Sequence, residues 1–132
     1  MKILIVEDNA PFALALQAVL QRLSPKARIV DTLEAAFSEL SPPAKVDTVV
    51  LDLTLPDAGP HQTLDAIKKM KEIGARVIVM TGNTPADLKE EIEQSGASAC
   101  FCKTDPDFVA SLREEIAHGT PEFTPFPGQA TP

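Results

Sequence analysis

Five short runs rich in apolar residues set the strongest limit on how this chain can fold. They cover residues 2–6, 28–30, 48–53, 76–80 and 99–102, and the second run is the weakest. The other four are apolar nearly throughout, without the alternation of a half-exposed strand. Such runs are typical of parallel strands that are covered on both faces. The sequence therefore predicts a central parallel sheet.

Helical patterns separate these runs. Four of the predicted helices begin after a residue suited to cap a helix N-terminus: Asn9, Thr32, Thr84 and Asp105. Pro85 and Pro106 then fit the first helical position. The third helix is predicted over about residues 60–73 and is ended by Gly74. Because strand and helix alternate five times, we expect a doubly wound α/β fold with helices on both faces of the sheet.

The chain is long enough for one domain, and its character changes near residue 118. Residues 119–132 contain four prolines and show neither a helical nor a strand period. We therefore predict a folded domain over residues 1–118, followed by a flexible proline-rich tail or linker stub over residues 119–132.

Charge and hydropathy limit the partners. The formal net charge of −7 argues against direct nucleic-acid binding, which needs a basic surface. No apolar run approaches the roughly 18 residues of a membrane span, and Glu7 ends the first run too early for a signal peptide. We expect a cytoplasmic protein. Cys100 and Cys102 are too close in sequence for an ordinary disulfide and are predicted to be reduced thiols.

Polar residues follow the predicted strands where each strand ends. Glu7 and Asp8 follow the first strand, Asp52 lies in the third, Thr81 follows the fourth and Lys103 the fifth. Ligands of open α/β sheets bind beyond the carboxyl ends of the strands, where the strand order reverses. With the order 2-1-3-4-5, three carboxylates, a hydroxyl and an ammonium group converge at that point.

This set of side chains fits phosphoryl transfer to a carboxylate. Three close carboxylates resist ionisation unless a cation is present, and oxygen ligands suit Mg²⁺ or Mn²⁺. A metal ion would keep Asp52 ionised and nucleophilic. Lys103 offers positive charge to phosphoryl oxygens, and Thr81 offers a hydrogen-bond donor.

The chain resembles the receiver domain of two-component response regulators over about residues 1–118. The resemblance rests on four segments in family-like order: residues 3–9 (ILIVEDN), 49–59 (VVLDLTLPDAG), 77–82 (VIVMTG) and 96–98 (GAS) leading to Lys103. It implies a flavodoxin-like (βα)5 fold with a five-stranded parallel sheet in the order 2-1-3-4-5.

The resemblance also implies a function. Asp52 would accept a phosphoryl group from the phosphohistidine of a sensor histidine kinase or a histidine phosphotransfer protein. Mg²⁺ would be held by Glu7, Asp8, Asp52 and the backbone carbonyl of Thr54. The chain would catalyse only its own phosphorylation and dephosphorylation. It would act on a downstream protein, or on an effector domain C-terminal to it that is missing here.

Further roles follow from the same resemblance. Thr81 would be the switch hydroxyl and Lys103 the phosphate-binding lysine, while Thr54 and Asn83 are candidates to tune the lifetime of the phosphorylated state. The output surface would be the fourth helix, fifth strand and fifth helix, where a homodimer is also conceivable. Cys100 stands where the family usually has an aromatic switch residue.

Two features depart from the family pattern, and two other functions compete. Cys100 gives little steric coupling, and Phe101 should point to the other face. Thr104 replaces the proline that usually follows the lysine. A haloacid-dehalogenase-like phosphatase also uses a strand-end Asp, but it needs a second Asp where Thr54 stands. The other alternative is a receiver-like scaffold that is not phosphorylated.

Overall fold

The computed structural model describes residues 2–41, 46–82 and 86–118. Its elements follow in the order β1 (Ile3–Val6), α1 (Ala10–Leu20), β2 (Arg28–Val30), α2 (Leu33–Leu40), β3 (Thr48–Asp52), α3 (Pro60–Ile73), β4 (Arg76–Thr81), α4 (Ala86–Gln94), β5 (Ala99–Cys102) and α5 (Phe108–His118). The predictions for Asn83, Thr84, Pro85 and the tail 119–132 lie outside the described residues. Among the described helices, every one is too short or too polar to cross a bilayer.

The five strands form one parallel sheet in the order β2-β1-β3-β4-β5, as predicted. Its register sets the carboxyl ends of neighbouring strands side by side. Val6 pairs with Leu51 across β1 and β3, and Asp52 pairs with Met80 across β3 and β4. The chain order reverses between β1 and β3, so the predicted site lies at the switch point of the sheet.

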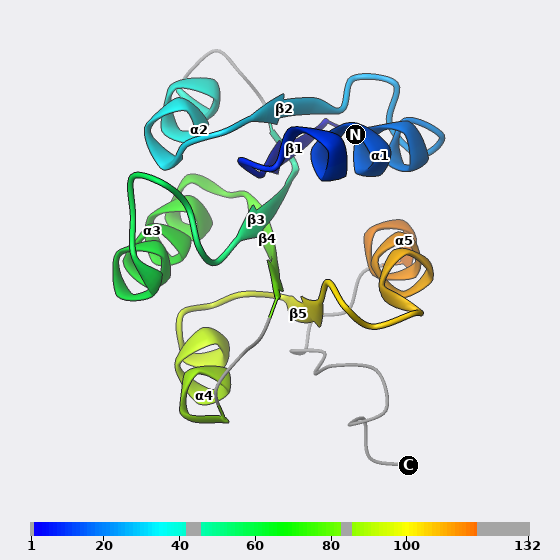
Figure 1. Ribbon diagram of the computed structural model, residues 1–132. Helices are drawn as coiled ribbons and strands as arrows, with labels where there is room; N and C mark the ends of the chain where they lie inside the picture. Colours follow the sequence, from blue (N-terminus) through cyan, green and yellow to red (C-terminus); the bar gives the residue numbers. More distant parts are fainter. Residues whose placement is uncertain (1, 42–45, 83–85, 119–132) are drawn as a thin grey trace.

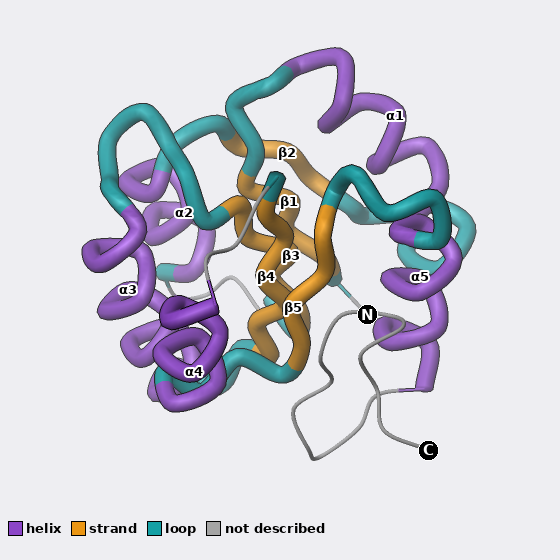
Figure 2. The backbone as a smooth tube through the Cα atoms, turned by 60° about the horizontal axis from the view of Figure 1, so that its bottom comes forward, coloured by secondary structure: helices purple, strands orange, loops and turns teal. Residues whose placement is uncertain are grey.

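The helices cover the sheet from both sides. Helices α2, α3 and α4 lie on one face, and α1 and α5 lie on the other (Figures 1 and 2). Alternate residues of the strands are buried against the two sets of helices. In β5, Cys100 belongs to the core under α2, α3 and α4, whereas Phe101 belongs to the core under α1 and α5. Both cysteines are free thiols.

Three of the predicted helix boundaries are confirmed. The side chain of Asn9 accepts a hydrogen bond from the backbone N–H of Phe12 at 3.0 Å, and that of Thr32 accepts one from Ala35 at 3.0 Å. Helix α3 ends at Gly74, whose φ of 104° is in the left-handed region that favours glycine. These caps fix the directions in which α1 and α2 leave the sheet.

The predicted start of the fifth helix is wrong. Helix α5 begins at Phe108, so Asp105 is not its cap and Pro106 is not its first residue. The Asp105 carboxylate accepts a hydrogen bond from Asp107 N at 2.8 Å, and Asp105 O accepts one from Phe108 N at 3.0 Å. The side chain and the backbone carbonyl of Asp105 therefore close a tight turn before the helix begins. Phe108, the first residue of α5, has its ring centroid 5.9 Å from that of Phe12 on α1.

Candidate functional site

Three carboxylates meet where β1 and β3 end. Glu7 and Asp8 follow β1, and Asp52 is the last residue of β3. One carboxylate oxygen from each of the three lies within 4.8 Å of the others. The Glu7 and Asp52 side chains are buried, and Asp8 is exposed at the mouth of the cluster. The convergence expected from the strand order is therefore present.

Lys103 reaches into this cluster from the end of β5. Its Nζ atom lies 3.0 Å from Asp52 Oδ2 and forms a second ion pair with Glu7 Oε2. The same ammonium group lies 4.9 Å from the centre of the Phe12 ring, close enough for a cation–π contact. The sequence suggested a lysine flanking the acids, and the structure places it in direct contact with two of them. Lys103 thus supplies a cation to the cluster from within the chain.

Backbone donors orient the other oxygens of the two buried acids. Asp52 Oδ1 accepts a hydrogen bond from Thr54 N at 3.1 Å. Glu7 Oε1 accepts one from Asn9 N at 3.0 Å, which ties the first turn of α1 to the cluster. Each of the two carboxylates is therefore held by a backbone N–H on one oxygen and by the lysine on the other.

The surroundings shift the pKa values of two groups in the site, Glu7 and Lys103. Burial raises the pKa of Glu7, and the nearby charge of Asp52 adds to the rise, while the bonds from Lys103 and Asn9 oppose it. Burial acts to lower the pKa of Lys103, but the hydrogen bonds and charges of Glu7 and Asp52 together outweigh it, so the pKa of Lys103 is raised. The lysine therefore stays charged while it bridges the acids.

Thr81 ends β4 and is buried beside the lysine. Its backbone carbonyl accepts a hydrogen bond from Lys103 N at 2.8 Å. Thr54 stands two residues after Asp52 with an exposed side chain, and its backbone N–H is the donor to Asp52 Oδ1. Cys100 lies away from these groups, buried in the core under α2, α3 and α4.

Sequence reasoning missed several residues that support the site. Asp57 is the clearest, because its carboxylate accepts hydrogen bonds from Leu33 N at 3.0 Å and Glu34 N at 3.1 Å. These bonds, led by the one from Leu33, lower the pKa of Asp57. They anchor the loop after β3 to the first turn of α2. The sequence around Asp57 did not indicate that its carboxylate would bind the start of α2, because Asp57 and Leu33 lie more than 20 residues apart.

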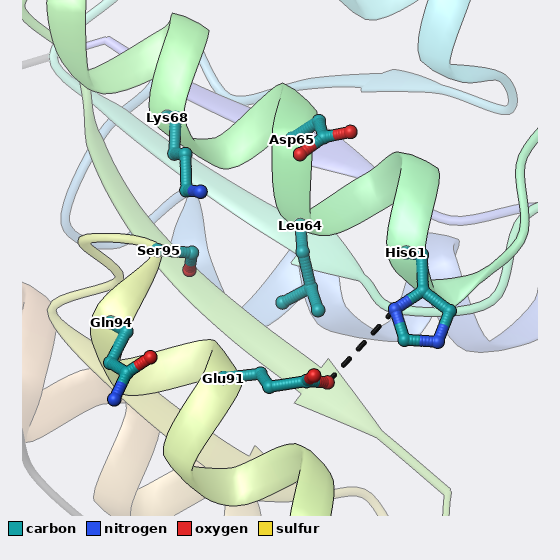
Figure 3. A pocket seen from close by; sticks show the side chains of 7 residues that line it. All are labelled: His61, Leu64, Asp65, Lys68, Glu91, Gln94 and Ser95. Atoms are coloured by element: carbon teal, nitrogen blue, oxygen red, sulfur yellow. Dashed lines mark ion pairs between the residues drawn. The ribbon is translucent and has the colours of Figure 1, made fainter.

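A groove of about 250 Å³ lies elsewhere, between α3 and α4 (Figure 3). At its mouth His61 Nδ1 stands 4.0 Å from Glu91 Oε2, and both side chains are well exposed. The residues that line it are His61, Leu64, Asp65, Lys68, Glu91, Gln94 and Ser95. None of them belongs to the acid cluster, so the groove does not form part of the candidate site.

Comparison with known proteins agrees with this geometry. An "Uncharacterized transcriptional regulatory protein YbdJ" of Bacillus subtilis (strain 168) is 32% identical over 124 residues, which are 93% of this chain and 54% of that protein. The autoinducer 2 sensor kinase/phosphatase LuxQ of Vibrio vulnificus is 26% identical over 118 residues, which are 89% of this chain and 13% of LuxQ. The chain thus spans about half of the first relative and a smaller part of the second.

Solved structures and a family model point the same way. A CheY-like receiver domain from Methanospirillum hungatei JF-1 superposes with a TM-score of 0.76 at 20% identity, covering 88% of this chain and 90% of that one, which shows the shared fold. Residues 3–113 match the model of the response regulator receiver domain. The chain therefore belongs to the receiver-domain family of two-component response regulators.

Proposed function

We propose that this chain is a phospho-accepting receiver in which Asp52 takes the phosphoryl group of a phosphohistidine. One observation carries the proposal. The Asp52 carboxylate ends β3 at the switch point, 3.0 Å from Lys103 Nζ and within 4.8 Å of oxygens of Glu7 and Asp8. A buried carboxylate that contacts a lysine and lies beside two further acids is arranged to accept a phosphoryl group. A purely structural acid would need only the lysine as its partner.

The chemical step moves one group between two nucleophiles. A carboxylate oxygen of Asp52 attacks phosphorus, and the new O–P bond forms as the P–N bond of the donor breaks. The ring leaves as neutral imidazole, with the electron pair of the broken bond on the departing nitrogen and its proton on the other nitrogen. Lys103 then has phosphoryl oxygens to contact in place of Asp52 Oδ2, and the Thr81 hydroxyl is the proposed second donor to them.

The oxygen donors of the acid cluster fit a hard divalent cation. Carboxylates of Glu7, Asp8 and Asp52 and the backbone carbonyl of Thr54 would hold Mg²⁺ or Mn²⁺, because all are oxygen donors and the three carboxylates already converge. When bound, the ion supplies positive charge that offsets the charge of the phosphoryl oxygens. Asp8, the exposed acid, is the member of the set most open to the entering ion.

The relatives support a partner class. LuxQ is named a sensor kinase/phosphatase and YbdJ a transcriptional regulatory protein. We infer that a sensor histidine kinase or a histidine phosphotransfer protein supplies the phosphoryl group. A downstream protein or an effector domain would receive the signal through α4, β5 and α5, and a homodimer through the same surface is a variant of this output.

A phosphate mimic tests the proposal. In saturating Mg²⁺, BeF₃⁻ should shift the backbone amide signals of Asp52, Thr81 and Lys103 in nuclear magnetic resonance spectra of the wild type. Asp52→Asn should show no such shifts, while Asp65→Asn, an exposed control on α3, should behave as the wild type. Equal responses of Asp52→Asn and the wild type would place the acceptor elsewhere. A wild type that never responds would favour the non-phosphorylated scaffold.

A further inference from the structure

The thiol of Cys102 contacts two polar atoms beside the candidate site. Cys102 is the last residue of β5 and is half-buried. Its Sγ atom lies 3.5 Å from the backbone carbonyl of Gly82 and 3.0 Å from the Thr104 hydroxyl. Cys100, two residues earlier on the same face of β5, is buried in the core under α2, α3 and α4, and Cys102 is partly buried against that same core. Cys102 therefore lies at the edge of this core, where its thiol reaches polar atoms of Gly82 and Thr104.

The direction of these hydrogen bonds follows from the chemistry of the groups. A carbonyl can only accept, so the Cys102 S–H donates to Gly82 O. This uses the single proton of the thiol, and the Thr104 hydroxyl must then donate to the sulfur. The result is one chain of two hydrogen bonds that runs from Thr104 through Cys102 to Gly82.

This chain joins the two segments that carry the proposed phosphate contacts. Gly82 directly follows Thr81, and Cys102 directly precedes Lys103. The backbone bond from Lys103 N to Thr81 O, 2.8 Å long, joins the same segments one residue away. A shift of Gly82 away from β5 would have to stretch or break the thiol contact. The position of Gly82 and the position of the lysine are thus linked through Cys102.

Thr104 is the residue that departs from the family pattern after the lysine. A proline there would have no side-chain donor, so the hydrogen bond to the sulfur exists only because a hydroxyl residue stands at this position. The Thr104 side chain is otherwise exposed. Here the loop after β5 is fastened by a side-chain bond instead of by a proline ring.

We propose that Cys102 is a positioning residue of the receiver site. With Thr104, its thiol holds Gly82, the residue after Thr81, against the segment that carries Lys103, and so sets how the hydroxyl and the ammonium group meet phosphoryl oxygens. This role rests on the proposed function of Asp52. The hydrogen bonds of the Cys102 thiol go to Gly82 and Thr104, and not to Glu7, Asp8 or Asp52. Mg²⁺ binding should therefore not depend on Cys102.

Matched pairs of variants separate the hydrogen bonds from packing. Cys102→Ser and Thr104→Ser keep a donor at each position, whereas Cys102→Val and Thr104→Val keep the approximate shape without the donor. Titrations with BeF₃⁻ in saturating Mg²⁺ should show affinities about threefold lower for the two Val variants, the size expected for loss of a weak hydrogen bond. Both Ser variants should bind as the wild type, and Mg²⁺ affinity should be the same in all five proteins. The carbonyl carbon signal of Gly82 should move most in Cys102→Val, the variant that removes its hydrogen-bond donor.

Three results would overturn this inference. Wild-type BeF₃⁻ affinity in both Val variants would show that the contacts do not position the site. Equal losses in Cys102→Ser and Cys102→Val would assign the effect to packing of the sulfur. Failure of the wild type to bind BeF₃⁻ would remove the proposed function and this role together, which distinguishes it from the first two results. If Cys102→Val does not fold, the exposed Thr104 pair still decides between these results.

Discussion

Lys103 Nζ lies 3.0 Å from Asp52 Oδ2 while it also pairs with Glu7, so one ammonium group bridges two buried carboxylates. The carboxylates come from neighbouring strands, β1 and β3, and the lysine comes from the far edge strand β5. The bridge therefore spans four of the five strands at their carboxyl ends. Without a divalent ion, it is the lysine that offsets the charge of the cluster.

Replacing Lys103 by Met should destabilise the metal-free protein and strengthen metal binding. The buried Glu7 would lose its cation, at a cost of about 2 kcal/mol, below the range for fully buried pairs because the lysine side chain is 20% exposed. The free energy of unfolding in EDTA measures this cost. The variant should also bind Mg²⁺ more tightly, because a competing positive charge has gone, yet bind BeF₃⁻ more weakly.

A double variant supplies the control for that prediction. Combining Lys103→Met with Glu7→Gln removes both the lysine and the carboxylate that it leaves unpaired. We expect the double variant to recover most of the lost stability, which gives a favourable coupling energy in the double-mutant cycle. Additive losses would mean that the ion pair contributes nothing to the fold.

The raised pKa of Glu7 predicts a pH dependence of stability. The folded chain holds this proton more tightly than the unfolded chain, where the ordinary pKa is 4.5. Glu7 thus favours folding fully below about pH 4.5, and this contribution is lost as the pH rises through the higher folded-state pKa. In EDTA, Glu7→Gln should flatten the stability profile in that window. The exposed control Glu72→Gln should leave the profile unchanged, and an unchanged profile for Glu7→Gln would contradict the burial argument.

The lowered pKa of Asp57 predicts the opposite dependence of stability on pH. Its pKa is lowered by the Leu33 and Glu34 backbone N–H groups, so its contribution is present above its ordinary value of 3.8 and is lost as the pH falls through the lower folded-state pKa. At neutral pH, Asp57→Asn should cost about 0.5–1 kcal/mol, as expected for a carboxylate at a helix N-terminus. Urea unfolding at neutral and acidic pH measures it. A cost that persists in full below the folded-state pKa would show that the charge is irrelevant.

Cys100 should matter little to the response of α4. Its side chain is buried in the core under α2, α3 and α4, and is far smaller than an aromatic ring. We expect Cys100→Ala to cost about 1 kcal/mol of stability through a small cavity. The amide shifts that BeF₃⁻ induces in α4 should remain nearly intact. Loss of the α4 response with BeF₃⁻ still bound would make Cys100 a switch residue.

The sheet and the strand-end acids could be predicted because both depend on local patterns. Apolar runs without alternation identify buried parallel strands, and the strand order then fixes that Glu7, Asp8 and Asp52 meet. The caps Asn9 and Thr32 were equally visible, since each bonds a residue three positions ahead. Contacts that reach only a few positions along the chain depend on the local sequence, so they can be predicted from it.

Contacts that depend on distant packing could not be predicted. The reach of Lys103 to both acids depends on how the edge strand β5 lies against β4 and on its long flexible side chain. The bond from Asp57 to α2 joins segments that only the complete sheet brings together. Asp105 failed as a helix cap because an Asp before Pro fits a turn as well as a helix start, and here it closes a turn with Asp107 and Phe108.

The most direct measurement is the intact mass of the protein after incubation with acetyl phosphate and Mg²⁺. The wild type should gain the mass of a single phosphoryl group, and the gain should disappear in EDTA and in Asp52→Asn. Peptide mapping after borohydride reduction should place the modification on Asp52. A wild type that gains no mass, or an Asp52→Asn protein that gains as much as the wild type, would contradict the assignment of Asp52 as the acceptor.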